Sequence, residues 1–168
     1  MPAQGGGRAA VGVGAVYRGG MGEVHAESTV RIERPSGEVL AVLRDIAGQS
    51  RWWPGQYRSE PLETDPEGRV TRALIGNDVR IAKDEFEVVY VHDPGSSGYR
   101  WELAAPSKVQ RAQAGSWTVA DDGSDACAVT LSLRVDSTLP LPGFIIRKTI
   151  QDTVDGATQG LRSRCLAR

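Results

Sequence analysis

The stretch that decides the fold is LPLPGFIIRKTIQDTVDGATQGLRSR, residues 139–164, near the C-terminal end of the chain. It opens with a stiff proline-rich connector. From about residue 144 onward, apolar residues recur at intervals of four, four, three and four, which is the pattern of an α-helix with one buried face. A helix of this length can cross a whole sheet face. The predicted buried stripe comprises Ile146, Ile150, Val154, Ala157 and Leu161.

Alternating segments separated by turn-forming residues precede this helix. They predict strands at residues 57–63, 69–75, 79–92, 99–103, 109–120 and 127–137. The turns lie at 65–68, 76–78, 93–95 and 121–123, which are rich in residues that tolerate turn dihedral angles. Consecutive strands joined by short turns form an antiparallel meander. Within residues 79–92 the apolar residues move from odd-numbered to even-numbered positions, so a regular strand would place them on opposite faces. A β-bulge near residues 83–85 is predicted to bring them back to one face.

The segment before this meander is predicted to hold one strand and two short helices. Residues 25–34 alternate with the period of a half-buried strand, with Ala26, Ser28, Val30 and Ile32 on one face. Apolar residues at helical spacing after Pro35 predict a short helix that ends near Gly48. A second short helix or turn is predicted at 49–53. One strand, a helical pair, a run of strands and a long helix form an α+β order.

The N-terminal residues 1–23 are rich in glycine and poor in large apolar side chains. They are predicted to be a disordered tail before a folded domain at residues 24–168. An internal start at Met21 is the alternative. The glycines of the tail loosely resemble a phosphate-binding loop, but no strand precedes them and no helical pattern follows. The apolar stretch after Arg8 is too short and too interrupted by glycine for a secretory signal.

Composition restricts the class of partner. A chain of 168 residues fits one domain with a real core. The net charge is −1 with both signs interspersed, so nucleic acid is not an expected partner. No run approaches the roughly 20 apolar residues that an integral membrane helix needs. Cys127 and Cys165 lie in unrelated contexts, which predicts neither a disulfide nor a metal site and favours a reducing cytoplasm.

Residues suited to acid-base chemistry are few and badly placed. A Ser-His-Asp triad needs a histidine between nucleophile and carboxylate, but His25 and His92 lie at predicted strand ends. The adjacent carboxylates of Asp84 and Glu85 are interpreted as solvated turn or strand-end groups, not as an acid-base pair across a cleft. No spacing of His, Cys or carboxylates fits a metal. The sequence therefore predicts no catalytic residue, no metal and no cofactor.

Several features follow one another in a recognisable order. They are the opening strand into Pro35, Asp45-Ile46 followed by Trp53-Pro54, YRWEL at 99–103, GSW at 115–117, and PLPG at 140–143. In this order and spacing, about residues 25–166 resemble the polyketide cyclase/dehydrase and lipid-transport branch of the START-like (SRPBCC) superfamily, which includes coenzyme Q-binding relatives. The resemblance implies a helix-grip fold, in which an antiparallel sheet wraps around a long C-terminal helix. It also implies a deep cavity for lipids, isoprenoids, sterols, polyketides or aromatic molecules.

Three functions fit this resemblance. Binding or carrying a small hydrophobic ligand ranks first. A polyketide aromatase/cyclase ranks second, acting mostly by orienting its substrate with inward polar groups such as Arg72, Arg80, Arg100 or Tyr57. A protein-interaction module of toxin-like type ranks third. An inward arginine or acid would favour the cyclase, a uniformly apolar lining would favour binding, and an exposed apolar patch without a cavity would favour the interaction module.

The ligand is predicted to lie between inward strand residues and the terminal helix. Trp101 and Trp117 are expected in the core, Trp53 at the mouth of the cavity, and Trp52 partly exposed. The predicted ligand-binding residues are Trp53, Tyr57, Leu74, Phe86, Val88, Tyr90, Trp101, Trp117, Ile150 and Val154.

Overall fold

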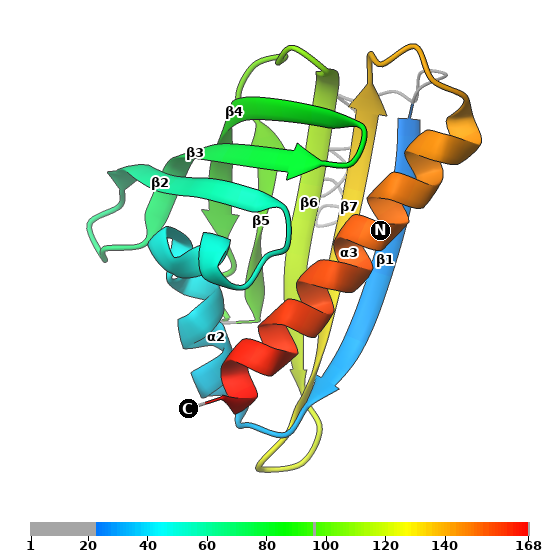
Figure 1. Ribbon diagram of the computed structural model, residues 1–168. Coiled ribbons are helices and arrows are strands. Elements are labelled where there is room, and N and C mark those ends of the chain that lie inside the picture. Colours follow the sequence, from blue (N-terminus) through cyan, green and yellow to red (C-terminus); the bar gives the residue numbers. More distant parts are fainter. Residues whose placement is uncertain (1–22, 96, 168) are drawn as a thin grey trace, which may run out of the picture.

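The computed structural model describes residues 23–95 and 97–167 (Figure 1). The tail predicted for residues 1–23 and the alternative start at Met21 lie outside the described residues, apart from Glu23, which opens the first strand. In chain order the elements are β1 (Glu23–Ile32), α2 (Ser36–Arg44), the 3₁₀ helix η1 (Ile46–Arg51), β2 (Gln56–Thr64), β3 (Val70–Val79), β4 (Ala82–His92), β5 (Gly98–Leu103), β6 (Gln110–Asp121), β7 (Cys127–Ser137) and α3 (Gly143–Leu166).

The strands form one antiparallel seven-stranded sheet in the order β1-β7-β6-β5-β4-β3-β2. Figure 1 shows this sheet curving around α3, with α2 beside the C-terminal end of that helix. Helix α3 packs on β1 and β7 and also contacts α2. The predicted α+β helix-grip fold is therefore confirmed. None of the helices among residues 23–95 and 97–167 has the length and apolarity needed to cross a lipid bilayer.

The first helical segment is shorter than predicted. Helix α2 ends at Arg44 because Asp45 leaves the helical region, with φ −80° and ψ 77°. The Asp45 carboxylate then accepts a hydrogen bond from the Gly48 backbone N–H at 3.2 Å and caps η1. A side-chain oxygen at this position satisfies a backbone donor that the start of a helix leaves free. The two short helices are therefore separate elements that meet at Asp45.

The hairpin between β3 and β4 differs from the predicted strands. Strand β3 continues to Val79, and the chain reverses in a two-residue turn at Arg80 and Ile81. Pairing runs without a register shift from Arg72 opposite Val89 to Val79 opposite Ala82. The turn predicted at 76–78 and the bulge predicted at 83–85 are therefore wrong. Pairing with neighbouring strands overrides the turn propensity of residues 76–78. The inward positions change from odd to even numbers because the chain reverses at the turn between β3 and β4.

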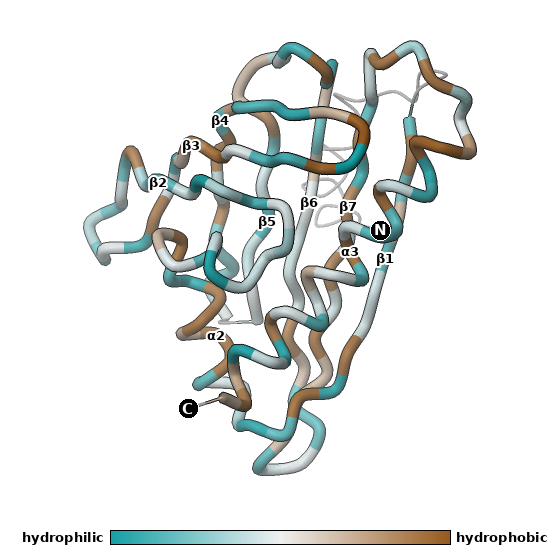
Figure 2. Tube along the Cα trace, viewed as in Figure 1, coloured by the Kyte–Doolittle hydropathy of each residue, from teal (hydrophilic) through white to brown (hydrophobic). Residues whose placement is uncertain are grey.

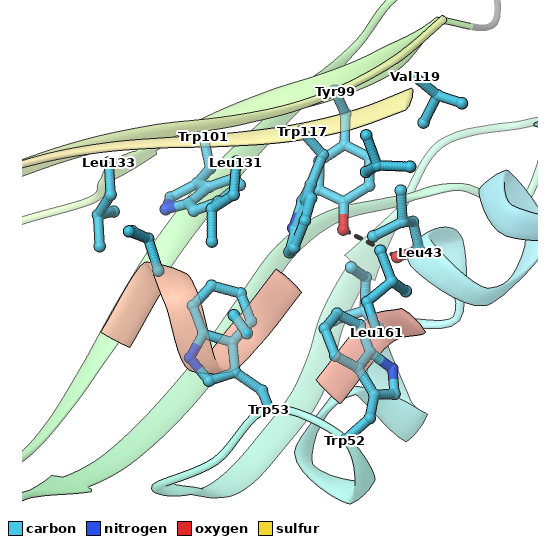
Figure 3. Packing of buried hydrophobic residues seen from close by; sticks show 14 of the residues in the cluster. Leu43, Trp52, Trp53, Tyr99, Trp101, Trp117, Val119, Leu131, Leu133 and Leu161 are labelled. Atoms are coloured by element: carbon cyan, nitrogen blue, oxygen red, sulfur yellow. Dashed lines mark hydrogen bonds between the residues drawn. The ribbon is translucent and has the colours of Figure 1, made fainter. Parts of the chain in front are cut away.

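Four tryptophans pack together at the centre of the core (Figure 3). The ring centroid of Trp53 lies 6.0 Å from that of Trp52, 5.9 Å from Trp117 and 6.5 Å from Trp101. Trp52 is only 6% exposed, so the prediction that it is partly exposed is wrong. Because the chain turns after η1 instead of continuing as a strand, neighbouring side chains need not point to opposite faces.

Tyr99 connects this core to α2. Its hydroxyl donates a hydrogen bond to the Leu43 carbonyl oxygen at 2.8 Å, drawn as a dashed line in Figure 3. Burial raises the pKa of Tyr99 well above its usual value. Cys127 and Cys165 are buried free thiols, as predicted. Burial also raises the pKa of Cys165 to about 11, which lowers its thiolate fraction and its reactivity.

Candidate functional site

A cavity of about 90 Å³ lies between the inner face of the sheet and the N-terminal half of α3. We call it the main cavity. Its walls come from the β3–β4 hairpin, from β6 and β7, and from α3, and most of them are apolar. The apolar lining residues include Val79, Ile81, Phe86, Leu133, Val135, Ile146 and Ile150.

A second cavity of about 30 Å³, the inner chamber, adjoins the main cavity. The two share Asn77, Phe86 and Gln113 as lining residues. The rest of the inner chamber is lined mainly by aromatic and aliphatic side chains of the core, among them Trp53, Ile75, Val88, Tyr90 and Trp101. Burial raises the pKa of the Tyr90 phenol above its usual value, because the ionised form would lose its hydration.

An open groove of about 390 Å³, the outer groove, lies on the other side of the main cavity. It runs between the β3–β4 turn, Pro54 and the start of α3, and it shares Val79, Ile81, Thr149 and Thr153 with the main cavity. Figure 2 shows hydrophobic colour at the tip of this hairpin and at the start of α3. Phe144, which is 65% exposed, lines the groove. The outer groove and the main cavity therefore meet at the β3–β4 turn and the first turns of α3.

A chain of hydrogen bonds crosses the wall of the main cavity. The Trp101 indole Nε1 donates to Gln113 Oε1 at 2.8 Å, and Gln113 Nε2 donates to Gln110 Oε1 at 2.6 Å. Gln110 Nε2 donates in turn to Asp84 Oδ2 at 3.2 Å. The Ser107 hydroxyl donates to the same Asp84 oxygen at 2.5 Å. The mainly apolar lining thus contains one connected polar strip that ends at a carboxylate, besides the separate polar residues Asn77, Ser137, Thr149 and Thr153.

Asp84 differs from its sequence-based interpretation. It was expected to be a solvated strand-end group, but it lies within β4, is 8% exposed and lines the main cavity. Its neighbour Glu85 points to the outer face, where it accepts hydrogen bonds from Tyr57 and Arg58. Alternation along β4 places Asp84 on the same face as Phe86. The expectation for Asp84 is therefore wrong.

The structure brings six of the predicted ligand-binding residues to the two cavities. Phe86 and Ile150 line the main cavity. Trp53, Val88, Tyr90 and Trp101 line the inner chamber together with Phe86. Trp53 is 7% exposed and lies deep in the core, so its predicted place at the cavity mouth is wrong.

The other four predicted residues do not line these cavities. Trp117 and Val154 are fully packed in the core. Tyr57 and Leu74 belong to the outer face of the sheet. The Tyr57 ring lies over Gly76 and is 44% exposed, and Leu74 alternates with the buried residues Ala73 and Ile75. Leu74 was assigned to the wrong face because both faces of β3 contain apolar residues.

Sequence reasoning missed the polar residues of the main cavity. The alternation of side chains along a strand could have identified two of them as inward-facing. Asp84 lies two residues before Phe86 and shares its face, and Gln113 lies four residues before the buried Trp117 and shares its face. Gln110 has the opposite parity to Gln113 and turns inward because the β6–β7 register shifts between Gln110 and Ala112. A register shift of this kind depends on the partner strand, so the local sequence does not predict it.

The arginines considered for a cyclase do not enter the cavities. Arg72 pairs with Glu87 at 2.8 Å on the outer face, and Arg80 lines the outer groove. Arg100 belongs to the outer face of β5, between the buried residues Tyr99 and Trp101. Within the described part of the chain, no arginine lines the main cavity or the inner chamber.

The histidines likewise lie away from both cavities. The imidazole of His25 is hydrogen-bonded to Ser132 at 2.9 Å, and that of His92 to the carbonyl oxygen of Val70 at 2.7 Å. In the ranges 23–95 and 97–167, no group of three or more His, Cys, Asp or Glu residues is arranged to hold a metal ion.

An antiparallel sheet that curves around a long C-terminal helix is the helix-grip architecture of START-like proteins. Residues 23–165 match the family model described as "Polyketide cyclase / dehydrase and lipid transport". The chain therefore belongs to this family. A search of curated proteins finds no match.

Solved structures with low sequence identity share the fold. A START superfamily protein from Mycobacterium smegmatis is 16% identical with a TM-score of 0.77, over 84% of this chain and 96% of that one. The Zhui aromatase/cyclase from Streptomyces sp. R1128 is 16% identical with a TM-score of 0.69, over 86% and 92%. A STAR-related lipid transfer protein from Xanthomonas axonopodis is 22% identical with a TM-score of 0.63, over 83% and 84%.

Helix α3 offers a test of the void beside it. Ile150 is half-buried and borders the main cavity, whereas Val154 is fully buried. Removing atoms beside an existing void breaks fewer contacts than emptying a packed site, so Ile150→Ala should destabilise by less than about 2 kcal/mol. We expect Val154→Ala to cost more, although valine loses fewer atoms. Urea unfolding measures the loss of stability in both variants. A larger loss for Ile150→Ala than for Val154→Ala would mean that no cavity lies beside Ile150.

Proposed function

We propose that this protein binds or carries a small hydrophobic molecule in the main cavity, which the molecule enters from the outer groove. The observation that supports the proposal is an apolar cavity with one polar strip, joined to an open groove through Val79, Ile81, Thr149 and Thr153. Concave sites lined mainly by apolar groups with a few placed polar ones are the usual form of small-molecule sites.

The volumes limit what the main cavity holds. At about 90 Å³ it is smaller than the roughly 150 Å³ apolar cavity that accommodates benzene. A sterol or polyketide therefore places only part of its body there and extends into the outer groove, whose volume is about 390 Å³. The tryptophan cluster fills the space in which a deeper cavity was expected. Burying about 400 Å² of apolar surface contributes roughly 10 kcal/mol before association costs, so we expect micromolar affinity.

Native mass spectrometry of the purified protein tests whether a molecule co-purifies. A titration with the neutral apolar dye N-phenyl-1-naphthylamine then measures binding. Because Trp53 and Trp101 line the inner chamber, binding should also quench tryptophan fluorescence.

A matched pair of variants locates the dye. Ala82 lines the main cavity, and its neighbour Lys83 is exposed and lies with its ammonium nitrogen 5.1 Å from the centre of the Tyr57 ring. Ala82→Phe should fill the cavity and weaken dye binding at least about tenfold, since the displaced contacts cannot form elsewhere. Lys83→Phe, which adds the same ring on the outer face, should leave binding unchanged. Equal binding by both variants would contradict a site in the main cavity.

Catalysis as a polyketide aromatase/cyclase is the second candidate, and Asp84 favours it. This buried carboxylate lines the main cavity, and an inward acid is the feature that separates a cyclase from a simple binding protein. In that role Asp84 would act as a general base on a bound polyketide while the cavity orients the chain. Turnover of a poly-β-ketone substrate that is lost in Asp84→Asn would support the cyclase, and absence of turnover would leave the binding protein.

A further inference from the structure

We propose that the main cavity selects ligands whose polar end donates a hydrogen bond, namely a hydroxyl or an ammonium group, and rejects carboxylates. This inference rests on the proposed function, because it concerns the ligand of the same cavity. Asp84 is the residue that sets the preference.

Asp84 presents a buried negative charge to the main cavity with no cation beside it. Both of its hydrogen bonds, from Ser107 and Gln110, reach the same oxygen, Oδ2. Among the residues that the structure describes, none donates to Asp84 Oδ1 and none forms an ion pair with this carboxylate. A buried charge is costly unless it is paired or fully hydrogen-bonded. Asp84 Oδ1 is not among the buried side-chain atoms that lack a partner, so it is the oxygen that a ligand with a donor group can reach.

The hydrogen-bond chain fixes which way the amides of the polar strip point. The indole nitrogen of Trp101 is only a donor, so Gln113 must turn its carbonyl oxygen toward Trp101. The Gln113 NH₂ group then faces the carbonyl oxygen of Gln110, and the Gln110 NH₂ group faces Asp84. A carboxylate accepts only, so both ends of the chain enforce the same orientation. The strip therefore ends at Asp84 Oδ2, which accepts from Gln110, and the second carboxylate oxygen, Oδ1, is left as a further acceptor.

A second acceptor lies nearby. Asn77 lines both the main cavity and the inner chamber, and its Oδ1 atom is buried and has no hydrogen-bond partner. A buried acceptor without a partner is destabilising, and a ligand donor removes that cost. Together, Asp84 Oδ1 and Asn77 Oδ1 give the cavity wall two acceptors that receive no hydrogen bond from the described residues.

The charged neighbours of Asp84 do not reduce its negative potential inside the cavity. Lys83 lies against Tyr57, and Glu85 is bonded to Tyr57 and Arg58, all on the outer face. Arg111 is paired with Asp136 at 2.8 Å. A carboxylate ligand in the main cavity would therefore face Asp84 as a like charge, which favours alcohols and amines over fatty acids.

A matched series of eight-carbon molecules tests the selection. Octan-1-ol, octylammonium and octanoate have the same chain and differ only at the polar end. Calorimetric titration of the wild-type protein at pH 7 should give dissociation constants for octan-1-ol or octylammonium at least about tenfold lower than for octanoate, since like charges repel at close range and more strongly beside the low-dielectric interior than in bulk water. The comparison of the two donors shows whether hydrogen bonding alone or charge pairing dominates.

Two variants assign the preference to its source. Asp84→Asn keeps the shape of the side chain and removes the charge, so the preference over octanoate should fall below about threefold. Glu85→Gln makes the same change one residue along β4 on the outer face and should keep the wild-type preference.

The other possible results separate the ligand preference from ligand binding itself. Octanoate binding as tightly as octan-1-ol to the wild-type protein would overturn the inference, as would a preference that survives in Asp84→Asn. If N-phenyl-1-naphthylamine still binds in either case, the proposed function stands and only the selection fails. If neither the dye nor any eight-carbon molecule binds, both fall together. The wild-type comparison remains decisive even if Asp84→Asn does not fold.

Discussion

Replacing Trp53 by alanine should destabilise the protein by about 3–5 kcal/mol, the range for emptying a large aromatic site in a core. Trp53 is buried, and its ring centroid lies within 6.5 Å of the ring centroids of Trp52, Trp101 and Trp117. Its removal leaves a void beside the inner chamber, because three aromatic neighbours cannot all collapse into the space. Urea unfolding of the two proteins gives the difference in free energy.

Tyr57→Ala is the control for this variant. Tyr57 was predicted to share the ligand site with Trp53, but it lies exposed on the outer face with its hydroxyl bonded to Glu85 at 2.8 Å. Surface hydrogen bonds contribute little, so Tyr57→Ala should change the free energy of unfolding by no more than about 1 kcal/mol. Similar losses in the two variants would mean that the structure has assigned the two aromatic residues to the wrong environments.

Gly160→Ala should destabilise by about 2–3 kcal/mol, even though alanine favours a helix by about 1 kcal/mol over glycine. A methyl group at Gly160 would overlap the carbonyl oxygen of Trp52, which belongs to the backbone and cannot swing aside like a flexible side chain. The missing side chain lets the segment of Trp52 and Trp53 lie directly against α3. Thermal unfolding and tryptophan fluorescence should both report the displacement of this segment.

Gly156→Ala, one turn earlier in α3, should have the opposite sign. A methyl group there would lie 3.5 Å from the nearest atom of Pro54, which is an ordinary van der Waals contact. The gain in helix propensity then dominates, and we expect stabilisation of up to about 1 kcal/mol. If Gly160→Ala also stabilises the protein, the close approach of Trp52 to α3 is wrong.

The two glycine positions bear on the site as well as on stability. The segment against Gly160 contains Trp53, which forms a wall of the inner chamber, and Pro54, which lines the outer groove. A displaced segment would therefore change both spaces. Dye binding by Gly160→Ala should weaken along with its stability, whereas Gly156→Ala should bind as the wild-type protein does.

The sequence by itself determined the elements whose apolar residues follow one uninterrupted period. The stripe from Ile146 to Leu161 predicted α3, because a single face of a helix repeats every three or four residues. The alternation of residues 127–137 predicted β7 with the bounds that the structure shows. Such periods arise within one segment, so they can be recognised without knowing which other segments pack against it. The α+β order of elements follows from them.

Only the tertiary structure decided which residues meet around the cavity. Tyr57 and Leu74 turned outward, because the face of a strand that is covered depends on the elements packed against it. Gln110 reached the main cavity through a register shift against β7, a property of two strands together. The close approach of Trp52 to α3 at Gly160 sets the place of its neighbour Trp53, which is a wall of the inner chamber. Each of these outcomes is set by contacts between segments distant in sequence, which local periodicity does not encode.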